Sequence, residues 1–368
     1  MSSQSHKTFR VAIIGVGGIA EILAQVLGQI PRASLVAGSC RTEARGRAFE
    51  KKFGATWFGD TERMLDEARP DVAIIATPSG AHLDGLLACA RRKIDVICEK
   101  PLEITPARVR QMIDAARDAQ IRLGAIFPQR FNPTNRAVYD AARTGRFGTL
   151  AAMQGTVPWW RDDHYYAPHR WQGKIALDGG GALMNQAIHT VDLLQWFAAA
   201  TMPELPHDVN PVEEVFALTA RRGHDPSLIE VEDTAVVTLK FRNGAVGQLL
   251  ATTSMYPGMQ RRIHVGGRDG SAEIFEEQLI TYQFRHERPG DDALRTELGK
   301  ATSHAAGASS PLAMSGENHR RNLEQFFEAL ANNRAPELDG IEGAKAVEIV
   351  DAAYQSARTG QPVIVGRE

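Results

Sequence analysis

A glycine-rich turn near the start of the chain limits its fold more than any other feature of the sequence. Residues 15–20 read Gly-Val-Gly-Gly-Ile-Ala; an apolar run over residues 9–15 leads into them, and residues 21–27 follow at helical spacing. This order predicts a strand, a tight turn and a helix. Gly15 permits the turn, Gly17 lets the backbone approach a pyrophosphate, and Ala20 allows close helix packing. We therefore expect a nucleotide at the helix N-terminus; the alternative is a glycine turn that only packs.

Strand-like and helix-like segments alternate through the first third of the chain. The sequence predicts strands over residues 9–15, 34–39, 71–76, 95–98 and 121–127, and helices over residues 21–27, 42–53, 81–92 and 105–119. Alternation of this kind favours a parallel, doubly wound α/β sheet of the Rossmann type. We expect this nucleotide-binding domain to span residues 1–130.

The pattern changes after residue 130, where strand-like segments follow one another. A helix is expected over residues 132–143, and strands over residues 150–160, 212–221, 232–241, 245–253, 261–266 and 271–275. Asn243-Gly244 is a strong hairpin signal. Residues 285–314 read as an irregular insertion, and helices over residues 318–330 and 341–357 close the chain. The sequence predicts an α+β domain with a largely antiparallel, open sheet over residues 131–368.

Composition excludes several classes of protein. The 368 residues carry a formal net charge of −2, which provides no basic field for nucleic acid. No apolar stretch approaches the length of a membrane span, and the N-terminal residues lack the apolar core of a signal peptide. The three cysteines, Cys40, Cys89 and Cys98, show no paired spacing. We expect a cytoplasmic protein with no nucleic-acid or membrane partner.

The residues at the end of the second expected strand help to distinguish NAD from NADP as the cofactor. An acidic residue there would accept the ribose 2′-hydroxyl and repel a 2′-phosphate, but residues 38–42 read Gly-Ser-Cys-Arg-Thr. The planar guanidinium of Arg41 suits a phosphate, and Ser39 or Thr42 could add a hydroxyl donor. We therefore favour NADP over NAD; the alternative is a solvated Arg41 that stacks on adenine, which NAD also allows.

A lysine marks the end of another expected strand. Residues 98–101 read Cys-Glu-Lys-Pro and follow the apolar run over residues 95–97. Ligands bind outside the carboxyl ends of the strands in such sheets. Lys100 is therefore the first candidate for catalysis.

One helix interrupts the strands of the second domain and carries polar side chains. It begins with three glycines after Asp178, and Asn185, His189 and Asp192 recur at i, i+4 and i+7, which is one helical face. The other faces are apolar, so these polar groups must be paired or functional. A buried hydrogen-bond network is the alternative to a catalytic site. We expect no metal, because His189 and Asp192 have no evident third ligand.

An aromatic loop precedes this helix. Residues 159–166 read Trp-Trp-Arg-Asp-Asp-His-Tyr-Tyr, and Arg-Trp follows at 170–171. Aromatic residues interleaved with Arg and His suit a sugar or an adenine ring, but they also suit a packed corner. The sequence leaves both interpretations open.

Taken together, these motifs resemble those of the Gfo/Idh/MocA oxidoreductases, which include glucose–fructose oxidoreductase and inositol dehydrogenase. The resemblance rests on the glycine turn, on Ala76-Thr77-Pro78 followed by His82, on residues 98–101, and on the three glycines followed by His189 and Asp192. It implies a Rossmann domain, a second α+β domain, a nicotinamide cofactor and a sugar or polyol substrate. It also implies a homodimer or homotetramer, often assembled through the second sheet.

The resemblance also implies site residues. Lys100 would contact the reacting hydroxyl, His189 would be the general base, and Asn185 would orient the hydroxyl. The implied cofactor contacts are Gly15, Gly17, Gly18, Ile19, Ala20, Cys40, Arg41, Thr42, Thr77, Pro78, His82, Glu99 and Lys100. The candidate substrate contacts are Arg130, Trp160, Arg161, Tyr165, Tyr166, Trp171, Asn185 and His189.

One position departs from the inositol dehydrogenase pattern. Those members carry Asp four residues before the histidine, where this chain has Asn185, as in the UDP-N-acetylglucosaminuronate 3-dehydrogenases. The resemblance therefore implies an NAD(P)-dependent dehydrogenase that acts on a secondary alcohol of a sugar or nucleotide sugar. Three alternatives stay open: a polyol or inositol-type dehydrogenase, an epimerase or glycosidase that uses transient redox, and an NADP-binding regulatory sensor.

Overall fold

The computed structural model describes residues 7–300 and 316–366. The chain divides into two compact units, each built from two stretches of sequence. Unit 1 comprises residues 1–128 and 315–344, and unit 2 comprises residues 129–314 and 345–368. Within the described parts of the chain, none of the helices combines the length and the apolar character that crossing a bilayer requires.

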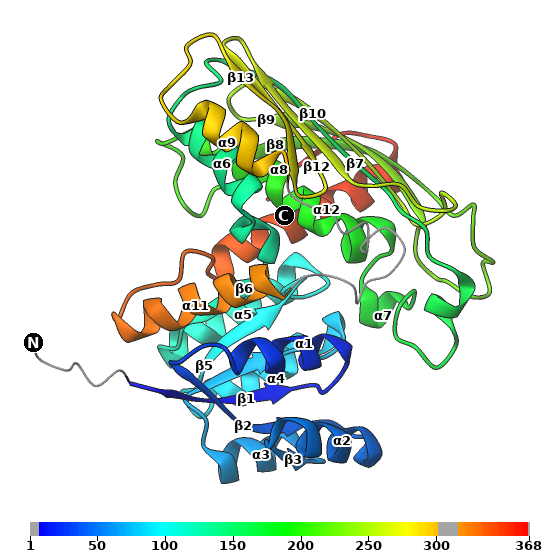
Figure 1. Ribbon diagram of the computed structural model, residues 1–368. Helices are drawn as coiled ribbons and strands as arrows, with labels where there is room; N and C mark the ends of the chain where they lie inside the picture. The colour runs from blue at the N-terminus through cyan, green and yellow to red at the C-terminus, as the bar shows by residue number, and fades with distance from the viewer. Residues whose placement is uncertain (1–6, 301–315, 367–368) are drawn as a thin grey trace, which may run out of the picture. The chain divides into compact units, whose positions relative to one another are not determined.

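Unit 1 is built on a six-stranded parallel sheet with strand order β3-β2-β1-β4-β5-β6, which confirms the doubly wound fold (Figure 1). Its strands are β1 (Phe9–Ile14), β2 (Ala33–Ser39), β3 (Thr56–Phe58), β4 (Val72–Ile75), β5 (Asp95–Glu99) and β6 (Leu123–Ile126). Its helices are α1 (Gly18–Leu27), α2 (Glu43–Phe53), α3 (Thr61–Ala68), α4 (His82–Ala90), α5 (Pro106–Ala119) and α11 (Glu317–Ala331). The strand order reverses between β1 and β4, and ligands of such sheets bind at this reversal.

Two elements of unit 1 escaped the sequence analysis, and a third belongs to a different unit than expected. The strand β3 has three residues and α3 has eight, which is too short for a clear periodic pattern. The helix α11 was expected in the second domain. Instead, Leu323, Phe326 and Phe327 pack into the core of unit 1, because they form an apolar face that the parallel sheet can cover.

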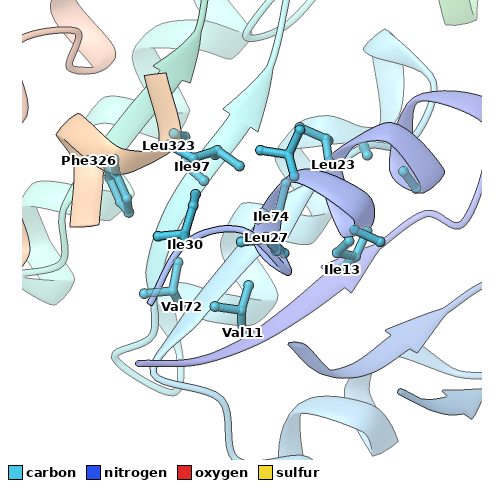
Figure 2. Packing of buried hydrophobic residues seen from close by; sticks show 14 of the residues in the cluster. Val11, Ile13, Leu23, Leu27, Ile30, Val72, Ile74, Ile97, Leu323 and Phe326 are labelled. Carbon is cyan, nitrogen blue, oxygen red and sulfur yellow. The ribbon is translucent and has the colours of Figure 1, made fainter. Parts of the chain in front are cut away.

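The core of unit 1 is a continuous cluster of aliphatic and aromatic side chains. It joins residues of β1, β4 and β5 to residues of α1, of the turn that follows α1, and of α11; Figure 2 labels ten of them. The labelled residues are Val11, Ile13, Leu23, Leu27, Ile30, Val72, Ile74, Ile97, Leu323 and Phe326. Because strands of a parallel sheet are buried on both faces, all four residues of β4 are inaccessible to solvent.

Unit 2 is built on an eight-stranded sheet with strand order β13-β12-β11-β7-β10-β9-β8-β14. Among the described strands of this sheet, only β7 and β10 pair in parallel, so the sheet is mixed and mostly antiparallel, as expected. Its strands are β7 (Leu150–Pro158), β8 (Val212–Ala220), β9 (Thr234–Phe241), β10 (Val246–Thr252), β11 (Arg262–Gly267), β12 (Gly270–Phe275), β13 (Gln278–Phe284) and β14 (Val363–Ile364). The strand β13 was not expected from the sequence.

The helices of unit 2 are α6 (Pro133–Arg143), α7 (Ile175–Asp178), α8 (Ile188–Ala200) and α9 (Asp291–Leu298), and α12 (Gly340–Thr359) begins in unit 1 and continues in unit 2 (Figure 1). The helix α9 falls inside the segment that was expected to be irregular, and residues 301–315 of that segment lie outside the described residues.

One face of the large sheet carries exposed side chains. Along β9 the burial alternates strictly, so that Ala235, Val237 and Leu239 face the core while the residues between them face outward. The exposed large apolar residues of this sheet are Phe216, Leu218, Val236, Val246 and Ile280. A shallow pocket of about 600 Å³ lies among Gln154, Gln248, His264 and their neighbours.

Candidate functional site

The glycine turn of unit 1 leaves room for a ligand. Gly15 has a φ of +93°, and a side chain there would lie 2.7 Å from the backbone nitrogen of Thr77, so glycine is required. A side chain at Gly17 would instead meet nothing within 4 Å. Beyond it α1 begins at Gly18, and the free N–H groups of its first turn suit a pyrophosphate. Ile19 is half-buried and Ala20 is fully buried against the sheet.

The end of β2 presents a polar edge without an acidic residue. Arg41 and Thr42 are exposed, while the Cys40 thiol donates to the Thr42 carbonyl. The Ser39 hydroxyl is buried and pairs with the Thr61 hydroxyl at 3.0 Å, so the expected second hydroxyl donor is already engaged. Arg41 and Thr42 remain the groups at this edge that suit a phosphate.

Two polar side-chain atoms at the carboxyl ends of β4 and β5 are buried without a hydrogen-bond partner among the described residues. They are Thr77 Oγ1 and Glu99 Oε1. Buried polar atoms in native proteins are nearly always paired, so these two point to a ligand that completes them. Half-buried Pro78 follows Thr77, and half-buried Lys100 follows Glu99. Together with the open space at Gly17, this edge fits a dinucleotide such as NAD(P).

The Glu99 carboxyl group is buried at this edge. Its Oε2 accepts a hydrogen bond from the backbone nitrogen of Lys100 at 3.1 Å. Burial raises the pKa of Glu99 to about 7, against the opposing effects of the Lys100 charge and of that hydrogen bond. Glu99 therefore titrates near neutral pH beside the candidate catalytic lysine.

His82 does not lie where a cofactor contact would. Its ring is 1% exposed, with Nε2 2.9 Å from the Thr77 carbonyl and Nδ1 2.9 Å from the Pro101 carbonyl. Burial lowers the pKa of His82, although the backbone carbonyls oppose this effect. The expectation that His82 touches the cofactor is therefore replaced by an indirect role: its ring connects the loops that carry Thr77 and Lys100.

The helix that carries His189 begins with a π-helical turn. Residues Ala182–Ala187 are π-helical and α8 continues from Ile188, so Asn185 lies in the π-turn and half-buried His189 in the first α-turn. Single π-turns inside helices are frequent at functional sites. The expected common face of Asn185, His189 and Asp192 assumed regular α-helical spacing. In the structure Asn185 and Asp192 belong to different hydrogen-bond networks.

Asp192 forms a buried ion pair with Arg130. Its two carboxylate oxygens accept from Arg130 at 2.6 and 2.8 Å, and both side chains are at most 3% exposed. The Arg130 guanidinium also lies over the Trp196 ring. This bidentate geometry is the strong form of an Arg–carboxylate pair. Arg130 is therefore assigned to the interior of unit 2, and its expected role as a substrate contact is not supported.

Two of the three glycines before the π-turn pack closely against other residues of unit 2. A side chain at Gly180 would lie 2.0 Å from the Tyr354 hydroxyl, and one at Gly181 would lie 1.8 Å from the Glu232 carbonyl. The half-buried Glu232 accepts through its carboxylate from the backbone nitrogens of Gly181 and Leu183. Tyr354 donates its hydroxyl to the same carboxylate at 2.9 Å. These contacts fix the start of the helix, and the sequence carried no signal for them.

A buried polar network connects Asn185 to the aromatic loop. Asn185 Nδ2 donates to Asp178 Oδ1 at 2.6 Å, and Gln186 Nε2 donates to Asn185 Oδ1 at 3.1 Å. Gln186 also donates to the Tyr165 hydroxyl and accepts from the Arg161 guanidinium at 2.7 Å. Asp178 and Gln186 were not predicted as site residues. The position of Asp178, directly before three glycines, was the only available signal.

The aromatic loop combines packing with surface exposure. Tyr166 is 3% exposed and donates its hydroxyl to Thr253, and Arg161 is also 3% exposed. Burial lowers the pKa of Arg161. These two residues are therefore interior groups, contrary to the expectation that they touch substrate. Trp160, Tyr165 and Trp171 are half-buried, so they keep exposed edges that a ligand could contact.

A second buried pair supports this loop and was missed in the sequence. His224 Nδ1 lies 3.3 Å from Asp233 Oδ2, and His224 Nε2 lies 2.8 Å from the Arg161 carbonyl. Burial lowers the pKa of His224, but the Asp233 carboxylate and the Arg161 carbonyl outweigh burial and raise it overall. Trp160 lies near the same ring in a stacked orientation. Among the described residues, no group of three His, Cys, Asp or Glu side chains is arranged to hold a metal ion.

The chain is similar to known dehydrogenases over nearly its whole length. The chain is similar to the WlbA dehydrogenase of Bordetella pertussis, whose structure contains NADH and UDP-GlcNAcA. The identity is 30% and the TM-score 0.88, over 98% of this chain and 99% of that chain. The WlbA dehydrogenase of Chromobacterium violaceum, also in complex with NADH and UDP-GlcNAcA, is 29% identical with a TM-score of 0.85, over 99% of this chain and 98% of that chain. The myo-inositol 2-dehydrogenase of Thermotoga maritima is 27% identical, over 94% of this chain and 96% of that protein.

Two family models together match most of the chain. The model described as oxidoreductase family, NAD-binding Rossmann fold, matches residues 9–127. The model described as oxidoreductase family, C-terminal alpha/beta domain, matches residues 141–365. This chain therefore belongs to the Gfo/Idh/MocA family of oxidoreductases, with an NAD-binding Rossmann domain followed by the family's C-terminal domain.

Proposed function

We propose that this protein is an NAD(P)-dependent dehydrogenase that oxidises a secondary hydroxyl of a nucleotide-linked sugar acid, at its 3-position. The observation that carries the proposal is the pair of buried polar atoms, Thr77 Oγ1 and Glu99 Oε1, which lie at the carboxyl ends of β4 and β5 next to Lys100 and indicate a ligand at this edge. The substrate class is supported by likeness to two dehydrogenases solved with UDP-GlcNAcA over nearly the whole chain.

The proposed chemistry separates into a hydride and a proton. A nicotinamide cofactor, held at the Gly17 turn and beside Thr77 and Glu99, would supply the hydride acceptor for the sugar carbon. His189 takes the hydroxyl proton, because an imidazole is the side chain best matched to proton transfer near neutral pH. Lys100 stabilises the negative charge that develops on the sugar oxygen. Asn185 orients the hydroxyl.

A kinetic screen tests this proposal. The purified chain is incubated with NAD⁺ or NADP⁺ and with UDP-GlcNAcA, UDP-GlcNAc or myo-inositol, and reduced cofactor is followed at 340 nm. We expect UDP-GlcNAcA to give the highest kcat/KM. Turnover of myo-inositol alone would replace the proposal by a polyol dehydrogenase. Conversion of the sugar with no net formation of reduced cofactor would indicate an epimerase or glycosidase that uses transient redox. Tight NADP binding with no turnover of any substrate would favour a regulatory sensor.

Single-residue variants test the assigned roles. Lys100→Met and His189→Gln should each lower kcat by about 10²–10⁴-fold while the affinity for NADH, measured by fluorescence quenching, stays within about threefold. If Lys100 and His189 serve one step, the double variant should lose much less activity than the product of the two single losses. Multiplying losses would show that they act independently.

We further propose NADP as the preferred cofactor and self-association through the large sheet. The exposed Arg41 and Thr42 at the end of β2, with no acidic residue among residues 38–42, support NADP. The exposed apolar side chains of the sheet, among them Leu218 at 62% exposure and Val246 at 56%, support a homodimer or homotetramer. Light scattering of wild type and of a Leu218→Lys variant tests the second point, since a monomeric wild type would contradict it.

A further inference from the structure

Asp178 and Asn185 form a carboxylate–amide pair inside unit 2. Asp178 is the last residue of α7 and Asn185 lies in the π-helical turn, seven residues later. Asn185 Nδ2 and Asp178 Oδ1 are 2.6 Å apart, and the two residues are 9% and 1% exposed. A hydrogen bond to an ionised carboxylate is shorter and stronger than one between neutral groups. The pair is therefore a strong, desolvated contact next to the helix that carries His189.

The pair determines which way the Asn185 amide faces. An amide nitrogen only donates and an amide oxygen only accepts. The Asp178 carboxylate therefore selects the nitrogen, while Asn185 Oδ1 accepts from Gln186 Nε2. A flipped amide would place two oxygens against each other at one end and two NH₂ groups at the other. The orientation of Asn185 is thus set by its neighbours.

We propose that Asp178 is a positioning residue for Asn185, and that it supplies from α7 the carboxylate that the helix itself lacks at position 185. The inference rests on the proposed function, in which Asn185 orients the substrate hydroxyl. The other acid of this helix, Asp192, is held by Arg130 in a separate ion pair. Asp178 is accordingly the carboxylate that bonds directly to Asn185.

The two oxygens of Asp178 have separate tasks, which makes the proposal testable. Oδ2 accepts from the backbone nitrogen of Gly173 at 2.8 Å, a contact that holds the preceding loop. An Asp178→Asn variant keeps an oxygen for Gly173 but turns an NH₂ group toward the Asn185 NH₂ group. It removes the orienting carboxylate while it preserves the loop contact.

Three variants and one control isolate the pair. Asp178→Asn should lower kcat about 10²-fold and leave KM within about threefold, because a misplaced polar group costs about that much in turnover. Asn185→Asp should place two carboxylates in contact and lower the melting temperature. The exchange variant, Asp178→Asn with Asn185→Asp, restores one amide and one carboxylate. We expect it to recover the melting temperature and to bring kcat within about tenfold of wild type.

The control variant is Glu230→Ala, which removes the acceptor altogether. The Glu230 carboxylate accepts from the backbone nitrogen of Ile175 at the start of α7, so this change loosens the same short helix without touching the pair. We expect its kcat to stay within about twofold of wild type. A loss equal to that of Asp178→Asn would show that general loosening of α7, rather than the pair, accounts for the effect, and would overturn the proposal.

A spectroscopic measurement keeps the inference separate from the proposed function. In protein labelled with ¹⁵N-asparagine, the Asn185 side-chain NH₂ resonance is assigned from its absence in Asn185→Asp. Its proton on the carboxylate should lie downfield in wild type and move upfield in Asp178→Asn. An unchanged resonance would overturn the inference even in an active enzyme.

A shifted resonance in a protein that oxidises no sugar would support the positioning of Asn185 while refuting the proposed function. The positioning role of Asp178 would also be overturned by a wild-type kcat in Asp178→Asn. An exchange variant that regains stability but no turnover would have the same consequence.

Discussion

The Glu99→Gln variant gives the sharpest test of the electrostatics at the cofactor edge. Glu99 is buried, and its pKa rises from 4.5 to about 7 because burial disfavours the charged form. The folded protein therefore holds a proton on Glu99 that the unfolded chain releases between about pH 4.5 and 7. By linkage, this group contributes stability that is fully present below pH 4.5 and is lost as pH rises to about 7.

The size of the effect follows from the shift in pKa. A rise from 4.5 to about 7 corresponds to about 3 kcal/mol of unfolding free energy, since one unit is about 1.4 kcal/mol. Glutamine resembles the protonated acid in shape and cannot ionise. Wild type and Glu99→Gln should therefore show a nearly constant difference at low pH, and their curves should diverge as pH rises. The variant gains stability relative to wild type by up to about 3 kcal/mol above pH 7.

Urea unfolding between pH 5 and 8.5 measures this divergence. Hydrogen exchange of peptides from β4 and β5 assigns the change to unit 1. Glu43→Gln is the matched control, because its side chain is 71% exposed and should leave the wild-type slope unchanged. Parallel stability curves for wild type and Glu99→Gln across the whole pH range would refute the reasoning.

Three further predictions concern other groups. His82→Ala should reduce kcat by at least about tenfold with a smaller effect on NADH affinity, because the ring connects the Thr77 and Pro101 loops without facing the cofactor; equal losses in both would contradict this. Arg41→Ala should weaken NADPH binding about tenfold and leave NADH binding within about twofold, as titration calorimetry would show; equal effects on both cofactors would remove the case for NADP. In wild type, the raised pKa of His224 contributes stability that is fully present below pH 6.5 and is lost as pH rises through that pKa. His224→Gln should lack this contribution, so the urea midpoints of the two proteins should differ at acidic pH and converge at alkaline pH.

The fold of unit 1 was largely predictable because its signals are local. The glycine turn, the strand before Lys100 and the helix that starts after Thr105 each depend on neighbouring residues: Thr105 accepts from the Arg108 nitrogen and Pro106 occupies the first turn, as expected. The strand β3 was missed because three residues carry no period. The return of α11 to unit 1 depends on packing partners roughly 200 to 320 residues away, which no local pattern encodes.

The site was less predictable than the fold for a related reason. Residue type and spacing singled out Lys100, Asn185 and His189, but the partners of these residues come from distant segments. The π-turn changes the register between Asn185 and Asp192, and a regular helical wheel cannot show it. Burial also separates side chains that share a motif: Arg161 lies in the interior, while Trp160 beside it keeps an exposed edge.

The return of α11 to unit 1 has a consequence for how the protein is made. The core of unit 1 needs Leu323, Phe326 and Phe327, so the part of unit 1 that ends at residue 128 cannot complete its own core when it is synthesised. At about 5–20 residues per second, the roughly 200 residues that separate residue 128 from the end of α11 take on the order of 10–40 s to translate. During that interval the nascent nucleotide-binding unit exposes apolar surface, and chaperones have a window in which to bind it. Unit 2, although later in the sequence, has most of its sheet available before unit 1 can close.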